Sequence, residues 1–245
     1  MRTEKQRIVQ GADTAILFVH GILGTPAHFE AFYPLVPSDW SFRGIWLRGH
    51  GGSVKDFASS SMSEWKAQVH SATLDLLKTH KKVIIAAHSM GTLFALREAT
   101  ELPITALFLL NVPLKAHIGR RLPKTIWAVF RGKIDPNDEW LLAAQKAYGI
   151  GRDMNILHYL GWIPRYLELF SEIRKTRKIV EKIKIPCRAY FSTEDEMVSP
   201  KSAEILAKNS SANIKILDSS GHFYYAPKDL ETLRRDFCEM IKETL

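Results

Sequence analysis

Hydrophobic residues along the chain fall into short apolar runs, separated by longer segments in which they recur at helical spacing. The runs are too short for ordinary helices and are rich in aliphatic and aromatic residues, which is typical of buried strands. They lie at residues 15–19, 42–47, 83–87, 105–110, 185–191 and 214–217. Helical spacing occurs at 26–33, 63–80 with Ser63 as its N-cap, 92–100, 200–208 and 227–244. This alternation predicts an α/β protein with a parallel sheet covered on both faces.

The alternation stops in the middle of the chain. Residues 113–185 contain helical patterns at 137–148 and 164–184 but no clear strand pattern. A chain of 245 residues with 46% hydrophobic content can bury one substantial core. We therefore expect one α/β core formed by residues 1–112 and 186–245, interrupted by a helical cap formed by residues 113–185.

The positive charge is concentrated in this predicted cap. The chain has a formal net charge of +8, and residues 113–185 contain 15 Lys and Arg against 7 Asp and Glu, which leaves 19 of each kind elsewhere. One interpretation is a solvated helical cover that its basic residues keep soluble. The other is a surface that meets an anionic substrate or lipid. Nucleic acid is not expected as a partner, because no helix-turn-helix, zinc-finger or RNP-like sequence accompanies the charge.

Several classes of protein are disfavoured by sequence features. The first ten residues are charged and contain no apolar stretch, and no run reaches membrane-spanning length, so neither a signal peptide nor a membrane anchor is expected. Two cysteines, Cys187 and Cys238, are too few for a disulfide framework and indicate buried thiols in a cytoplasmic protein. Without a P-loop, a G-x-G-x-x-G after a strand, H-E-x-x-H or paired C-x-x-C, we expect no cofactor and no metal.

One serine stands at a point where a strand turns directly into a helix. The apolar run 83–87 leads through His88 to Ser89, and the helical pattern begins at Thr92. A side chain on such a turn projects from the carboxyl edge of the sheet, where a nucleophile would be accessible. The alternative is a serine that merely caps the helix. The choice between a nucleophile and a helix cap depends on whether a base, an acid and an oxyanion site accompany Ser89.

The segment A-H-S-M-G resembles the G-x-S-x-G nucleophile elbow of the alpha/beta-hydrolase family, with Ala87 in place of the first glycine. In this family an acid and then a histidine follow the serine, each in a loop after a strand. The resemblance implies His222, in S-G-H-F, as the base and Asp195, in D-E-M-V-S-P, as the acid. Glu194 is the reserve acid, whereas Asp218 is expected to cap its loop.

Two backbone N–H groups are implied by the same resemblance as the oxyanion hole, those of Ile22 in H-G-I-L-G and Met90 after the serine. The sequence R-G-H-G-G-S at 48–53 also matches a family loop near the site. His20, His50 and His88 are expected to be structural.

The combined motifs look closest to small bacterial carboxylesterases and monoacylglycerol lipases, which implies an alpha/beta-hydrolase fold and hydrolysis of carboxylic esters through an acyl-enzyme on Ser89. An acyl lipid and an anionic ester are the two kinds of small-molecule ester that the basic cap suggests. A thioesterase or a carbon-carbon bond hydrolase would share the triad, and a non-catalytic ligand-binding homologue is the alternative from another class. The oligomeric state is not predicted. Aromatic residues of the cap are candidates to line an acyl pocket or to pack the cap onto the core: Trp127, Phe130, Trp140 and Trp162.

Overall fold

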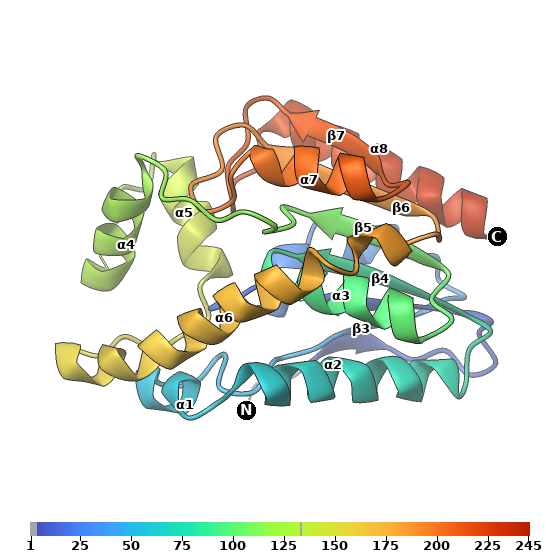
Figure 1. The fold of residues 1–245 in the computed structure, drawn as a ribbon, viewed down its shortest axis with the longest axis horizontal. Helices are drawn as coiled ribbons and strands as arrows, with labels where there is room; N and C mark the ends of the chain where they lie inside the picture. Colours follow the sequence, from blue (N-terminus) through green and yellow to red (C-terminus); the bar gives the residue numbers. More distant parts are fainter. Residues whose placement is uncertain (1–3, 133) are drawn as a thin grey trace.

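Seven strands form one sheet in the computed structural model, which describes residues 4–132 and 134–245 (Figure 1). The strand order is β1-β3-β2-β4-β5-β6-β7, and all neighbours are parallel except β1 and β3. This confirms the mostly parallel sheet predicted from the alternating pattern. The sequence analysis does not predict β1, because its polar residues form no apolar run. The strands are β1 Lys5–Arg7, β2 Thr14–Val19, β3 Ser41–Gly44, β4 Lys82–His88, β5 Ala106–Leu110, β6 Cys187–Ser192 and β7 Asn213–Leu217.

The sheet separates two hydrophobic clusters, as strand β4 illustrates. Its side chains alternate: Val83, Ile85 and Ala87 enter one cluster, and Ile84 and Ala86 enter the other. The first cluster is covered by α2 Met62–Leu77, α3 Met90–Glu101, α6 Ile163–Thr176 and α7 Lys201–Asn209, and the second by η1 Pro26–Phe29, η2 Tyr33–Leu35 and α8 Pro227–Thr244. Burial on both faces explains why the sequences of the central strands β2, β4 and β5 are almost continuously apolar.

Helix α2 begins earlier than the sequence analysis expects. Its N-cap is Ser61, whose hydroxyl accepts the N–H of Glu64, so the expectation for Ser63 was wrong. The spacing S-x-x-E between Ser61 and Glu64 is the usual signature of such a start. The helical pattern after Pro26 is two short 3-10 turns, η1 and η2, and the short helix α1 Val54–Ala58 was not predicted.

The segment predicted as a cap, residues 113–185, contains more helices than its sequence pattern indicates. Its elements are α4 Leu122–Arg131, α5 Glu139–Ala147, η3 Ile156–Trp162, α6 and η4 Val180–Lys182. Helix α4 was not predicted, although Pro123 near its start and Gly132 (φ 66°) after its end are ordinary boundary signals. Helix α6 ends at Thr176, before the predicted end at Lys184.

In Figure 1, α4 and α5 lie beyond the carboxyl ends of the strands, while α6 runs back across α3. The loops after β2, β4, β5, β6 and β7 open towards the same edge of the sheet, and chemistry in an α/β sheet is expected there. Over the described part of the chain, none of the helices combines the length and hydrophobicity that crossing a membrane would need.

Candidate active site

Ser89 occupies a strained turn between β4 and α3. Its backbone has φ 50° and ψ −124°, outside the regions that a residue with a side chain ordinarily adopts. The turn requires small neighbours: a Cβ on Gly91 would lie 2.3 Å from the carbonyl oxygen of Val19, and one on Gly21 would lie 2.8 Å from Cβ of Ser89. The small residue at position 91 therefore allows α3 to start directly against β2.

Two further residues share this strain. Among the described non-glycine residues, positive φ occurs at Leu23 (58°), Ser89 and Asn111 (54°). Leu23 follows β2 and Asn111 follows β5, so all three lie in loops at the carboxyl edge of the sheet. Residues held in such conformations cost free energy and cluster at functional sites.

The acid and base predicted from the sequence are hydrogen-bonded to each other. Nδ1 of His222 lies 2.9 Å and 3.0 Å from the two carboxylate oxygens of Asp195, and both residues are buried. Oδ1 of Asp195 also accepts the N–H groups of Met197 (2.7 Å) and Val198 (2.6 Å). A carboxylate at Nδ1 assigns the proton of the neutral imidazole to that nitrogen and leaves Nε2 as an acceptor.

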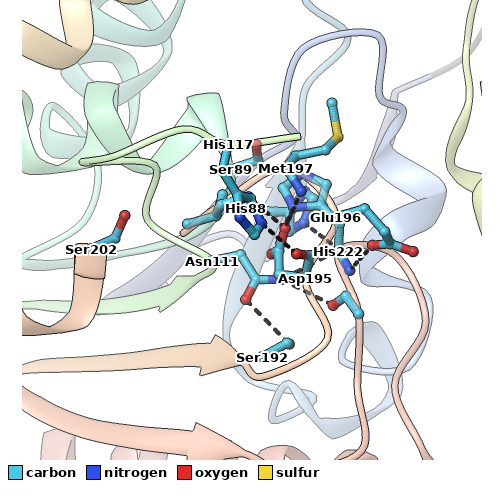
Figure 2. Close-up of polar contacts among 12 residues, drawn as sticks. His88, Ser89, Asn111, His117, Ser192, Asp195, Glu196, Met197, Ser202 and His222 are labelled. Carbon is cyan, nitrogen blue, oxygen red and sulfur yellow. Dashed lines mark hydrogen bonds and ion pairs between the residues drawn. The ribbon is translucent and has the colours of Figure 1, made fainter. Parts of the chain in front are cut away.

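The main chain of His222 is held from both sides, as Figure 2 shows. Its carbonyl accepts Nε2–H of His88 at 2.9 Å and Nδ2–H of Asn111 at 3.4 Å, and its N–H donates to Oε2 of Glu196 at 2.8 Å. Since His88 directly precedes Ser89, these bonds tie the loop of His222 to the turn that carries Ser89. Sequence reasoning missed Asn111 and Glu196, whose only signal was their position directly after a strand or beside the predicted acid.

The other two acids considered in the sequence do not bond to the imidazole ring. Glu194 and Asp218 are exposed. The N–H of Glu194 donates to the carbonyl of Ser220, and the carbonyl of Asp218 accepts the hydroxyl of Thr193. Of the three candidates, Asp195 is the one that contacts His222.

The two N–H groups predicted for an oxyanion hole lie at neighbouring strand ends. Met90 is the first residue of α3, where N–H groups have no acceptor within the helix. Ile22 lies in the buried loop after β2, whose shape His20 maintains. The ring of His20 donates from Nδ1 to the carbonyl of Gly21 (2.8 Å) and accepts the N–H of Leu47 at Nε2 (3.2 Å).

Three buried histidines, His20, His50 and His88, and the half-buried His28 lie around the site and are neutral at pH 7. Burial lowers the pKa of His20 to about 4 and that of His28 to about 3. It also holds the pKa values of His50 and His88 well below the usual range. The rings of His28 and His88 stack with centroids 3.7 Å apart. These residues support the loops without adding charge beside the Asp195–His222 pair.

The segment predicted as a cap begins beside the loop that carries Asp195. Ala116 forms an antiparallel bridge with Val198, and the N–H of Gly119 donates to the carbonyl of Glu196 at 2.8 Å. Nε2 of His117 lies 2.7 Å from the carbonyl oxygen of Asp195. Residues 115–119, called the cap linker below, therefore form one side of the support for Asp195.

Helix α5 and the residues after it cover the site. Trp140 packs so closely on Gly221, the neighbour of His222, that a Cβ there would lie 2.1 Å from the Trp140 ring. The N–H of Gly149 donates to the carbonyl of Leu23 at 2.7 Å. With these contacts in place Ser89 is only 6% exposed.

The remaining aromatic residues predicted for the cap lie elsewhere. Trp162 is buried against Phe57, with ring centroids 5.0 Å apart, and donates to the carbonyl of Val54 at 3.1 Å, so it packs the cap onto the core. Trp127 and Phe130 lie on α4, with ring centroids 6.2 Å apart, and Trp127 is 55% exposed.

One cluster of possible metal ligands occurs among the described residues, and it is not at this site. His70, Glu98 and Glu101 bring their ligand atoms within 4.8 Å of one another between α2 and α3. Glu98 lies eight residues along α3 from Met90, a rise of roughly 12 Å. The geometry around Ser89 therefore involves no group of this cluster.

Comparison with known proteins gives a consistent result. The sequence profile of the alpha/beta hydrolase family matches residues 16–233. No curated protein sequence matches the chain. One similar solved structure is that of Paleococcus ferrophilus monoacylglycerol lipase (18% identity, 99% of both chains, TM-score 0.70). A second comes from work on the metagenome-derived lipolytic enzymes LipS and LipT (17% identity, 98% of this chain and 97% of that chain covered, TM-score 0.71). A third is a soluble variant of Saccharomyces cerevisiae monoglyceride lipase with a substrate analog (14% identity, 98% of this chain and 91% of that chain covered, TM-score 0.70).

Proposed function

Because the chain belongs to the alpha/beta hydrolase family, we propose that it is a serine hydrolase that cleaves carboxylic esters through an acyl-enzyme on Ser89. The observation that carries this proposal is the buried hydrogen bond between Asp195 and His222, whose main chain is bonded to the residue before Ser89. Serine, base and acid thus come from three loops at one edge of the sheet, in the chain order of this family.

In the proposed reaction, Oγ of Ser89 attacks the ester carbonyl while Nε2 of His222 takes its proton. Asp195 holds the ring in the productive tautomer and stabilises the imidazolium that forms. The N–H groups of Ile22 and Met90 donate to the oxyanion. His222 then gives its proton to the leaving alcohol. Water, activated by the same ring, attacks the acyl-enzyme, and Ser89 regains its proton as the carboxylic acid leaves.

The surface of the cap favours an ester with an apolar acyl chain. Of the large hydrophobic residues that are exposed in the described chain, most belong to the cap, whereas soluble proteins rarely expose large contiguous apolar patches. One row follows η3 and α6 at helical spacing: Leu160, Ile163, Leu167 and Phe170. The monoacylglycerol lipase among the similar structures agrees with an acyl lipid substrate. Ser89 is only 6% exposed, so the segments that cover the site are expected to shift before such a substrate reaches it.

The test is covalent labelling followed by a substrate panel. A fluorophosphonate is expected to label Ser89, located by peptide mass mapping, and Ser89→Ala is expected to remove both labelling and turnover. The panel compares p-nitrophenyl esters, acyl-CoA thioesters and monoacylglycerols of several chain lengths. Faster turnover of thioesters would instead favour a thioesterase. Folded protein that neither reacts with the probe nor turns over any substrate would favour a non-catalytic homologue.

A further inference from the structure

A second carboxylate lies against His222, and the reaction described above does not use it. Glu196 is 8% exposed, and its Oε2 accepts the main-chain N–H of His222 at 2.8 Å. Asp195, its neighbour in the chain, accepts Nδ1–H of the same histidine. Two consecutive residues, Asp195 and Glu196, therefore hydrogen-bond to the ring and to the main chain of His222.

The Glu196 carboxylate has little freedom to move away. The carbonyl of Glu196 accepts the N–H of Gly119, and a Cβ on Gly119 would lie 2.8 Å from Cα of Glu196. On the other side, a Cβ on Gly221 would lie 3.0 Å from Oε2 itself. Glycine at both positions lets the cap linker and the histidine loop close around this side chain.

Few other charges face His222. On its inner side the rings of His88 and His28 are neutral, because burial lowers their pKa values. Tyr225 is half-buried, and desolvation raises its pKa, so it is uncharged as well. On the outer side, the depression beside Glu196 is lined by several titratable or charged residues: His117, Arg120, Arg121, Glu194 and Asp195. The two arginines are exposed and weaken the field of Glu196 only in part.

We propose that Glu196 is a positioning residue that acts through His222: its carboxylate fixes the histidine loop and its negative charge stabilises the imidazolium formed when Ser89 is deprotonated. The inference rests on the proposed function. The two carboxylates have different roles in this proposal. Asp195 selects the tautomer of the ring, whereas Glu196 adds negative charge without touching the ring nitrogens. Because the Glu196 carboxylate is hydrogen-bonded to the main chain of His222 and partly screened by water, its removal is expected to make the ring harder to protonate by about half to one pH unit.

The test uses Glu196→Gln, because an amide oxygen can still accept the His222 N–H while the charge is lost. The profile of kcat/KM against pH is measured from pH 5 to 9 on an ester that the wild type hydrolyses. The midpoint of the acidic limb is expected to fall by about half to one pH unit, with a several-fold loss of kcat on the plateau. Glu194→Gln removes the same charge from the exposed side of the same loop and is expected to move the midpoint by less than about 0.2 units.

Glu196→Ala provides a second neutral variant if the glutamine protein does not fold, and the same fall in midpoint is expected. An unchanged midpoint in a folded neutral variant would overturn the proposal, because a purely structural acceptor does not alter the protonation of the ring. Equal shifts in the Glu196 and Glu194 variants would also overturn it. Failure of the proposed function is recognised separately, since the wild type would then show neither turnover nor labelling.

Discussion

Replacing Asp195 by asparagine is expected to reverse the tautomer of His222 with little change in the fold. Oδ1 of Asp195 accepts the N–H groups of Met197 and Val198, so the single carbonyl oxygen of an asparagine is required at that position. The amide NH₂ must then occupy the position of Oδ2, which lies 2.9 Å from Nδ1 of His222. The remaining carbonyl oxygen lies 3.0 Å from Nδ1 but already accepts two N–H groups, so the nearer NH₂ favours an acceptor at Nδ1. The proton then moves to Nε2, and the ring can no longer take a proton from Ser89.

The expected fall in kcat follows from the two orientations that the asparagine amide can adopt. Turning the amide over would restore the tautomer but would break the bonds to Met197 and Val198, at about 1 to 3 kcal/mol each. The variant also loses the negative charge that stabilises the imidazolium. We therefore expect kcat to fall about 10³- to 10⁴-fold, which corresponds to about 4 to 5.5 kcal/mol of activation free energy.

The assay is ester hydrolysis by Asp195→Asn at pH 7 to 8, with circular dichroism and thermal melting to show that the variant is folded. Glu194→Gln is the matched control, because Glu194 is the neighbouring acid that the sequence left in reserve, and its activity is expected to stay within about threefold of wild type. The reasoning would be refuted if the folded Asp195→Asn protein kept more than a tenth of the wild-type kcat. It would also be refuted if the activity of Glu194→Gln fell by more than about threefold.

Three further predictions concern the nucleophile, the buried histidines and the turn. Ser89→Ala is expected to lower ester turnover to background while the melting temperature stays close to wild type, and turnover above a mock-purified control would contradict this. Unfolded histidines bind protons below about pH 6.5, whereas folded His20 stays neutral down to about pH 4, so acidification stabilises the unfolded chain. The free energy of unfolding is therefore expected to fall between pH 7 and pH 5, by up to about 2 kcal/mol from His20 alone, and equal urea midpoints would argue against it. Gly91→Ala places a Cβ 2.3 Å from the carbonyl oxygen of Val19 and is expected to cost about 2 kcal/mol or more, read as a fall in melting temperature; an unchanged melting temperature would show that the turn relaxes.

The centre of the sheet was predictable because β2, β4 and β5 are buried on both faces and are therefore almost continuously apolar. Strand β4 carries this signal directly, whereas β1 pairs through its backbone at the sheet edge with polar side chains and leaves no pattern. Helix α4 was missed for a related reason: none of its residues is buried, so no face of it is defined by packing against the core.

The proposed triad follows from motif and chain order, whereas its surroundings depend on the folded structure. Asp195 could be preferred over Glu194 from spacing, but the choice becomes physical only when its two oxygens are seen to accept two N–H groups and the His222 ring. Asn111 contributes through a left-handed backbone and a contact 111 residues away along the chain. No local sequence pattern encodes such a contact.

The cap linker determines where a chimeric enzyme could be joined. Exchanging caps between related hydrolases is an obvious way to change substrate preference, and Pro113, where the βα alternation stops, is the natural first choice of junction. A graft cut there would replace residues 115–119 and with them the backbone partners of Glu196 and Val198. A junction at Arg120 would leave the acid loop with its own support. Transplants made at the two junctions should therefore differ in catalytic rate even when they carry the same foreign helices.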